Sequence, residues 1–437
     1  MGKIAERESA MEHGAGESVD LTAFVLSTEH RVEQDRSRIV FYGKSARGPV
    51  RVSASFEPYF FVEDGAPLPE RFGSPTIESG FRALAGHPVR RVAFPSVPAA
   101  EAARVSARSA GLRMYESDVR PRDRFFMDRR LNGGVRILGG AERRGRLLCF
   151  RNPTLEPSDV EPQLMVCSLD IETSVSNGTL LSIGVHLTGG GTEVGHVFMK
   201  GSGPTGGNDL SYHSDEGSLL RAFTGWFEGA DPDIVIGWNV VGFDLSFLAR
   251  RASTLGVPLR LGREDREMFL GDSNTRFPRV VLPGRAVLDG PQLLKTSFFQ
   301  FESYSLESVS RAVLGEGKLI APDRNRAWEI ERLFERDKPA LAAYNLKDCV
   351  LVSRIFSRLQ LMELTVRRSE LTGQPLDRVN MSTASFDHFY LPRLHDAGFV
   401  APDLDDIGEV TASGGGHVME PVPGLYDDVV SLDFQSL

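Results

Sequence analysis

Short β-rich runs dominate the first third of the chain. Residues 22–28 and 38–42 are rich in β-branched and aromatic side chains, and residues 49–56 alternate polar with apolar positions. A period of two places one set of side chains on the buried face of a sheet. The pattern therefore predicts antiparallel strands and a β-rich domain over residues 21–160.

Other segments of this region carry different signals. Residues 1–20 are polar and lack an apolar core, which predicts a disordered tail and not a signal peptide. The remaining signals predict an Ala-rich helix at 98–110, a hairpin at 136–150 that turns at Gly139-Gly140, and a linker with three prolines at 152–162.

From residue 161 onward, apolar strands alternate with helices. Strands are expected at 164–169, 180–187, 194–199 and 234–238, a hairpin near 280–288, and helices from a cap at Ser214, at 244–255, twice within 290–315, and at 338–362. Strands that alternate with helices predict an α/β layer in which helices cover the faces of a sheet. The predicted fold class is therefore α/β.

Composition narrows the class of protein. A chain of 437 residues is long enough for two to four domains, and its 41% hydrophobic and 25% charged residues exclude a disordered protein. Cys149, Cys167 and Cys349 lack metal-type spacing and do not suggest a disulfide framework, which favours a reducing cytoplasm. No apolar run reaches about 18 residues, so a membrane-spanning helix is excluded.

The net charge of −9 conceals an uneven distribution. Residues 81–151 hold sixteen arginines, no lysine and six acidic residues, whereas residues 402–437 hold eight acidic residues and no lysine or arginine. A basic segment in an acidic chain suggests a polyanion-binding face beside a site rich in carboxylates. Arginines that only cover solvated faces, as a GC-rich genome would favour, are an equally open explanation.

Asp170 and Glu172 end an apolar strand that starts at Leu164. They are two residues apart, so both carboxylates project from one face while Leu169 and Ile171 point into the core. Two like charges side by side are costly to bury unless a cation neutralises them. Oxygen ligands of this kind suit Mg²⁺ or Mn²⁺.

Two further acidic positions complete the pattern. Asp244 follows a buried strand and stands at the start of a helix, where a carboxylate is favourable. Tyr344 and Asp348 are four residues apart on the long helix and share one of its faces, so a phenol and a carboxylate can orient a water beside a metal.

Each element alone has an ordinary structural explanation. An Asp-x-Glu pair is common at strand ends, Asp244 alone is more typical of a helix cap, and Tyr344 with Asp348 alone is typical of a helix surface. Their order and spacing together favour a shared site. The sequence contains no His-Glu-x-x-His, phosphate-binding loop, dinucleotide fingerprint or Gly-x-Ser-x-Gly motif, which argues against those chemistries.

These blocks resemble the three exonuclease motifs of the family B DNA polymerases. The motifs read Asp-Ile-Glu-Thr at 170–173, Asn-x-x-x-Phe-Asp at 239–244 and Tyr-x-x-x-Asp at 344–348. Supporting blocks at 115–119, 124–126, 303–306, 314–318 and 414–418 extend the resemblance over nearly the whole chain. The wording of 237–245, 344–349 and 423–426 is closest to bacterial members of the family. The resemblance implies an RNase H-like exonuclease domain, a mixed sheet flanked by helices, over residues 161–375.

The resemblance also covers the last residues. The Gly-Gly motif at Gly415-Gly416 is similar to the linker that precedes the polymerase palm, and residues 431–437 are similar to the start of the first polymerase motif. Asp433 matches the first metal-binding aspartate of that motif. Residues 376–437 are therefore expected to begin a palm that stops within the motif, so polymerisation is expected only of a full-length enzyme.

The family implies roles for the individual residues. Asp170, Glu172 and Asp348 would hold the metal that activates water, and Asp170 would bridge to a second metal that Asp244 reaches directly or through water. Two such ions lie about 4 Å apart and clamp the attacking and leaving oxygens. Tyr344 would orient the water. The expected DNA contacts are Asn239, Phe243, Thr173, Gly415 and Gly416.

The sequence therefore predicts the N-terminal part of a DNA-directed DNA polymerase with two-metal 3′→5′ proofreading. The implied cofactor is Mg²⁺ or Mn²⁺. The implied partners are a DNA primer 3′ end, single-stranded template and the remaining palm, fingers and thumb. A sliding clamp is a further candidate, and no membrane partner is expected. A stand-alone 3′→5′ exonuclease without a polymerase domain and a non-catalytic DNA-holding module are the alternatives.

Overall fold

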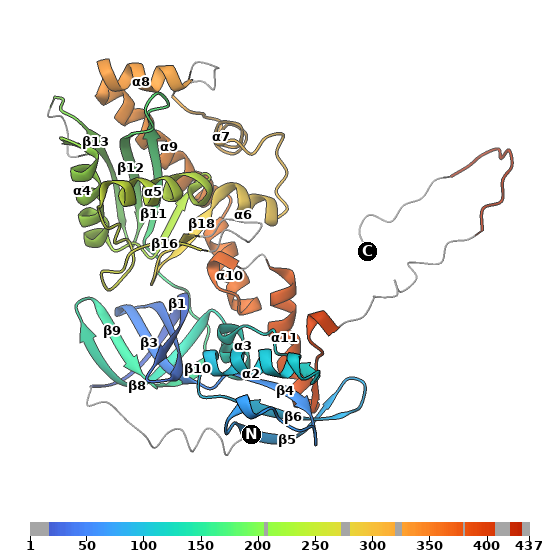
Figure 1. Ribbon diagram of the computed structural model, residues 1–437. Coiled ribbons are helices and arrows are strands. Elements are labelled where there is room, and N and C mark those ends of the chain that lie inside the picture. The colour runs from blue at the N-terminus through green and yellow to red at the C-terminus, as the bar shows by residue number, and fades with distance from the viewer. Residues whose placement is uncertain are drawn as a thin grey trace.

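The computed structural model describes residues 17–204, 209–271, 280–319, 326–378, 381–406 and 420–430. Three large sheets and one two-stranded sheet organise them, and most helices of the second half surround one of the large sheets (Figure 1). The predicted α/β class, with a β-rich first part, is confirmed. None of the helices in the described residues combines the length and apolarity needed to cross a bilayer.

The first sheet closes on itself. Its order is β1-β2-β3-β9-β8-β10, and β1 also pairs with β8. The strands are β1 (Glu17–Glu33), β2 (Arg36–Ser45), β3 (Gly48–Phe56), β8 (Gly134–Arg144), β9 (Leu147–Arg151) and β10 (Thr154–Pro157). Closure gives the barrel an interior of alternating apolar residues, including Val25, Phe41 and Val52, and Phe125 and Phe126 pack against them.

Three expectations for this region need correction. β1 begins at Glu17, so residues 17–20 belong to the barrel, and residues 1–16 lie outside the described part. The hairpin turns between Arg144 and Leu147, not at Gly139-Gly140, because these glycines pair with β1 where a Cβ on Gly139 would lie 3.2 Å from Pro153. The expected linker contains β10, which pairs with β8 despite its prolines because it lies at a sheet edge.

A second, five-stranded sheet has the order β19-β5-β6-β4-β7. It comprises β4 (Tyr59–Glu63), β5 (Thr76–Ala83), β6 (Pro88–Ala93), β7 (Met114–Tyr115) and β19 (Phe399–Val400), with α2 (Val97–Ser109), α3 (Pro121–Asp128) and a 3₁₀ turn (Glu70–Phe72) beside it. β19 comes from the far end of the described chain, so residues 381–406 return to the N-terminal region (Figure 1).

The third sheet is mixed, with the order β14-β13-β12-β11-β15-β18. Its strands are β11 (Val166–Thr173), β12 (Leu180–Gly189), β13 (Thr192–Lys200), β14 (Leu210–His213), β15 (Ile234–Gly237) and β18 (Ala286–Asp289). β11 is central: it runs antiparallel to β12 and parallel to β15. Its continuous apolar run fits a strand covered on both faces.

Helices cover both faces of this sheet. The helices of the second half are α4 (Glu216–Ala230), α5 (Leu245–Leu255), α6 (Gly290–Thr296), α7 (Leu306–Leu314), α8 (Arg326–Arg336), α9 (Lys338–Arg358), α10 (Leu361–Thr372) and α11 (Ser382–Asp396), with a π-helical turn (Val240–Asp244) and 3₁₀ turns (Leu376–Arg378, Leu404–Asp406). The helices α4 and α5 share one core with the sheet, and α6, α7 and α9 share another on the opposite face.

Two predictions for the second half are wrong in detail. The expected hairpin at 280–288 does not form, because a turn at Pro283-Gly284 sends its halves to different sheets: β17 (Val280–Val281) pairs with β16 (Phe269–Leu270), and β18 pairs with β15. Helix α4 is capped by Asp215 and not by Ser214, in a reciprocal capping box with Ser218.

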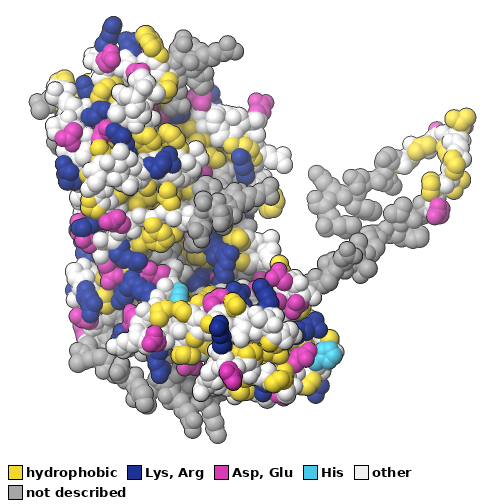
Figure 2. Space-filling model, viewed as in Figure 1, with side chains coloured by type: hydrophobic (Ala, Val, Ile, Leu, Met, Phe, Trp, Pro, Cys, Tyr) yellow, Lys and Arg dark blue, Asp and Glu magenta, His cyan; other side chains and the backbone are white. Residues whose placement is uncertain are grey.

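The basic segment at 81–151 is largely neutralised. At least nine of its sixteen arginines form ion pairs with described residues: Arg91, Arg104, Arg108, Arg122, Arg124, Arg130, Arg136, Arg144 and Arg151. On the face shown in Figure 2, Lys and Arg side chains are interspersed with Asp and Glu. These pairings weaken the interpretation of the segment as one continuous polyanion-binding surface.

Candidate metal centre

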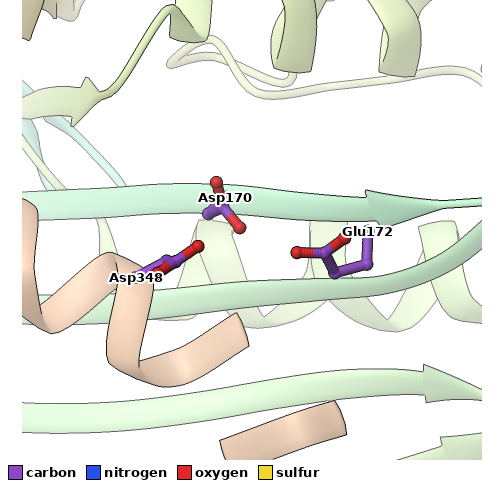
Figure 3. A group of neighbouring side chains, drawn as sticks. All are labelled: Asp170, Glu172 and Asp348. Carbon is purple, nitrogen blue, oxygen red and sulfur yellow. The ribbon is translucent and has the colours of Figure 1, made fainter. Parts of the chain in front are cut away.

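Three carboxylates converge beside the mixed sheet. Asp170 and Glu172 lie on β11 and Asp348 lies on α9, and one oxygen of each falls within 4.8 Å of the others (Figure 3). Glu172 and Asp348 are buried, and Asp170 is half-buried. Carboxylate oxygens at this spacing can share a hard divalent cation. The donor set therefore fits Mg²⁺ or Mn²⁺ and does not suit a metal that prefers sulfur or nitrogen.

The strand pleat explains the placement of Asp170 and Glu172. Leu169 and Ile171 belong to the core that β11 shares with α4 and α5, so Asp170 and Glu172 project toward α9 on the opposite face. The placement of Asp348 depends on how closely α9 approaches the sheet. Asp170 pairs across the sheet with Gly184, where a Cβ would lie 2.9 Å from the Asn345 side chain of α9. The absence of a side chain at Gly184 lets the helix carry Asp348 to the strand.

Asn345 and Lys318 are two neighbours of the cluster. The amide of Asn345 donates to Asp170 Oδ2 at 2.7 Å and accepts a bond from Ser182 Oγ at 3.0 Å. The ammonium of Lys318 forms an ion pair with Asp348 and lies 3.4 Å from the Tyr344 hydroxyl. Both side chains orient carboxylates, and Lys318 also offsets part of their negative charge.

Asp244 lies next to the cluster but outside its mutual 4.8 Å set. Its Oδ1 accepts the backbone N–H of Ile171 at 3.1 Å, and its side chain makes no helix-capping bond, so the simple cap explanation is wrong. Burial raises the pKa of Asp244 well above its usual value, and the charges of Asp170 and then Glu172 raise it further. A nearby cation would remove most of this cost.

The turn before Asp244 presents two of the expected DNA contacts. Asn239 has a left-handed backbone (φ 68°) and is exposed, and Phe243 remains 42% exposed in the following π-helical turn. An exposed aromatic ring beside a carboxylate cluster is suited to stacking on a nucleobase. Thr173 ends β11 just after Glu172, at a bulge in the ladder with β12.

The structure thus brings together five of the expected catalytic residues. Asp170, Glu172 and Asp348 form the cluster, Tyr344 is buried one helical turn before Asp348, and Asp244 adjoins β11. Gly415, Gly416 and Asp433 lie outside the described residues. The motifs did not single out Asn345 and Lys318, although both stand inside blocks that carried the resemblance, at 344–348 and 314–318.

The cluster can support hydrolysis of a phosphodiester. Three carboxylates converge beside the central strand β11, a fourth carboxylate and a phenol adjoin them, and the turn that leads to Asp244 carries two exposed side chains. Two-metal phosphoryl transfer uses carboxylates that hold hard cations and a group that orients water.

Comparisons with known proteins agree with the family that the motifs resemble. Residues 112–309 match the family described as DNA polymerase family B, exonuclease domain. DNA polymerase II of Escherichia coli (strain K12) is 42% identical over 338 residues, 76% of this chain and 42% of that protein. A DNA polymerase of Thermococcus sp. (strain 9oN-7) is 26% identical over 446 residues, 94% of this chain and 52% of that protein. The expected likeness to bacterial relatives is confirmed, and the chain spans about half the length of these relatives or less.

A solved structure shows the same fold. The family B DNA polymerase from the hyperthermophilic archaeon Pyrobaculum calidifontis superposes with a TM-score of 0.72 at 21% identity, covering 87% of this chain and 51% of that one. At this identity the likeness establishes the architecture, and the chemistry rests on the residues described above.

Proposed function

The chain belongs to the family B DNA polymerases, and from this premise we propose that it carries the 3′→5′ exonuclease centre of such an enzyme. The convergence of Asp170, Glu172 and Asp348 within 4.8 Å supports this proposal most directly. The proposed exonuclease domain spans residues 161–375, between the β-rich domain at 21–160 and the start of a palm at 376–437.

Each group in the site has a proposed task. Asp170, Glu172 and Asp348 would hold one divalent cation, with Asp170 shared by a second that Asp244 serves. Bound Mg²⁺ or Mn²⁺ lowers the pKa of a water and stabilises the leaving 3′-oxygen. The Tyr344 hydroxyl orients the attacking water, and Lys318 holds the Asp348 carboxylate in place. Asn345 fixes the Asp170 carboxylate through its amide.

The substrate would be a single-stranded DNA 3′ end. Phe243 offers an exposed ring for the terminal base, and Asn239 offers an exposed amide beside it. We further propose that the full-length enzyme is a DNA-directed DNA polymerase in replication or repair, with Asp433 among its polymerase ligands. The relatives described above are DNA polymerases, which favours this proposal over a stand-alone exonuclease.

Digestion of a labelled single-stranded oligonucleotide tests the proposal. Wild-type protein should shorten it from the 3′ end with Mg²⁺ and not with EDTA, and Asp170→Ala or Asp244→Ala should abolish digestion while circular dichroism stays unchanged. Glu193→Gln, an exposed carboxylate on β13, is the matched control and should remain active. Near-normal digestion by both active-site variants would refute the assignment.

A second substrate addresses proofreading. A mispaired primer end melts at lower cost than a paired one, so it should enter the site and be cut faster. Equal rates on the two ends would argue against a proofreading role.

A further inference from the structure

The turn that carries Asn239, Phe243 and Asp244 has an unusual backbone. Asn239 has a positive φ of 68°, and residues 240–244 form a π-helical turn. Both features cost free energy and persist only where neighbouring structure fixes them. The Phe243 N–H closes the turn on the Asn239 carbonyl at 2.8 Å.

Asp289, at the end of β18, supplies such a contact from another strand. It pairs with Gly237 in the β15–β18 ladder, which places its carboxylate beside the start of the turn. Its Oδ2 accepts the Val241 N–H at 3.3 Å, which ties β18 to the backbone of the turn. Its Oδ1 accepts the Gln292 N–H at 3.5 Å and so caps α6.

The surrounding packing leaves the turn little alternative. A Cβ on Gly237 would lie 2.5 Å from Val240, and a Cβ on Gly290 would lie 2.8 Å from the Trp238 ring. The Ser246 hydroxyl donates to the Val241 carbonyl at 2.7 Å. Val241 is therefore held through both backbone groups, and Asp289 holds the N–H.

We propose that Asp289 is a positioning residue for the exonuclease centre: its carboxylate fixes the backbone of residues 239–244, so that Asn239 and Phe243 face the DNA end while Asp244 stays against β11. This inference rests on the proposed function and deepens it. Asp289 is not a member of the three-carboxylate cluster, and it acts through the backbone N–H groups that donate to its carboxylate.

Hydrogen exchange gives the first test and requires neither metal nor substrate. In Asp289→Ala, amides of the peptide covering 237–245 should exchange about tenfold faster or more, because bonds to a charged acceptor are lost. Asp289→Asn keeps one acceptor oxygen and should fall between Ala and wild type. If Asp289→Ala does not fold, the comparison of Asp289→Asn with wild type provides the test.

Asp215→Ala provides the matched control. Asp215 caps α4 through a bond from the Ser218 N–H at 2.7 Å, away from the site, so this variant loses a helix cap of the same kind. It should leave exchange at 237–245 and digestion at wild-type levels.

Kinetics give the second test. Asp289→Ala should raise KM for single-stranded 3′ ends and the Mg²⁺ concentration for half-maximal rate by about tenfold each, with Asp289→Asn intermediate. Exchange and KM no different from those of Asp215→Ala would overturn the inference. A wild-type protein without Mg²⁺-dependent digestion would refute the proposed function instead, and the exchange result would still decide the role of Asp289.

Discussion

Within the part of the chain that the structure describes, the Lys318 ammonium supplies a positive charge to the carboxylate cluster. Its side chain is 9% exposed, and its partner Asp348 is fully buried. Asp170, Glu172 and Asp244 lie nearby, and the raised pKa of Asp244 shows how strongly burial and like charge oppose ionisation there. Because a divalent ion and Lys318 neutralise the same charges, each should matter more when the other is absent.

In the absence of metal, Lys318→Met should be less stable than wild type. Removing one partner of a buried pair should lower the free energy of unfolding by up to about 3–5 kcal/mol. Excess MgCl₂ should then raise Tm more in the variant than in wild type, because binding to the folded state stabilises it by mass action. Differential scanning fluorimetry with and without MgCl₂ measures both effects.

Lys347→Met is the control for this experiment. Lys347 pairs with Glu316 on a partly exposed surface, where an ion pair contributes about 0–1 kcal/mol. Its Tm should respond to MgCl₂ as wild type does. An equal MgCl₂ response in Lys318→Met would mean that the lysine and the metal do not neutralise the same charges.

At the residue scale, local periodicity is enough to predict much of the site. Strand alternation placed Asp170 and Glu172 on one face, and helical spacing placed Tyr344 and Asp348 on another. Neither rule could show that Asn345 and Lys318 touch these carboxylates, because those contacts depend on how α9 and the 314–318 segment approach the sheet.

At the scale of elements, the approach of α9 to the sheet depends on glycines. Gly184 lies under Asn345, and Gly195 lies under Leu346, where a Cβ would be 2.8 Å from the leucine side chain. A glycine in a strand weakens it, and such a position often marks close approach of another element. Here that element is the helix that delivers Asp348.

Gly184→Ala should therefore affect both stability and activity. Asn345 is fully buried and bonded to Asp170, so the added methyl group cannot be accommodated by a side-chain movement into solvent. Overpacking of this kind should cost about 1–3 kcal/mol. Displacement of Asn345 should also lower the exonuclease rate, measured by oligonucleotide digestion.

Gly225→Ala on α4 is the control, because, apart from its chain neighbours and the backbone of its own helix, no described atom lies within 4 Å of the point that an added methyl group would occupy. It should stabilise the helix by up to about 1 kcal/mol and leave the rate unchanged. Unchanged stability and rate in Gly184→Ala would show that α9 does not depend on this gap.

Element prediction failed where partner choice decided the outcome. The apolar segment near 280–288 predicts a hairpin, but a hydrophobic pattern does not say with which strand a run will pair. The turn at Pro283-Gly284 separates its two halves into different sheets. Likewise, Gly139-Gly140 is a typical turn pair, yet it lies inside β8, where a Cβ on Gly139 would lie 3.2 Å from Pro153.

At the scale of the molecule, Glu116 joins the N-terminal region to the segment at 381–406. Its carboxylate accepts bonds from Arg124 Nη1 at 2.8 Å, His395 Nε2 at 2.9 Å and the Ala401 N–H at 3.0 Å. Arg124 belongs to α3, whereas His395 and Ala401 belong to the returning segment at 381–406. This buried carboxylate therefore ties the returning segment to the N-terminal sheets.

The charge of Glu116 is stabilised by these partners. Burial alone would raise its pKa, but Arg124, His395 and the Ala401 N–H outweigh burial and lower the pKa to about 2 from an ordinary 4.5. A lowered pKa in the folded state contributes stability above pH 4.5, and the contribution is lost as pH falls from 4.5 through about 2. The linked free energy is about 3 kcal/mol.

Glu116→Gln should release the returning segment. Arg124 would then be buried without its carboxylate, which costs about 3–5 kcal/mol, so amide exchange over residues 382–401 should accelerate at neutral pH. The variant should also lack the part of the acid-induced stability loss that wild type shows between pH 4.5 and 2. Glu78→Gln, whose pair with Arg91 is partly exposed on the second sheet, should leave exchange over 382–401 unchanged and alter the free energy of unfolding by no more than about 1 kcal/mol. If exchange over 382–401 stayed at wild-type levels in Glu116→Gln, the segment would have to be held by its β19–β5 pairing and apolar contacts alone.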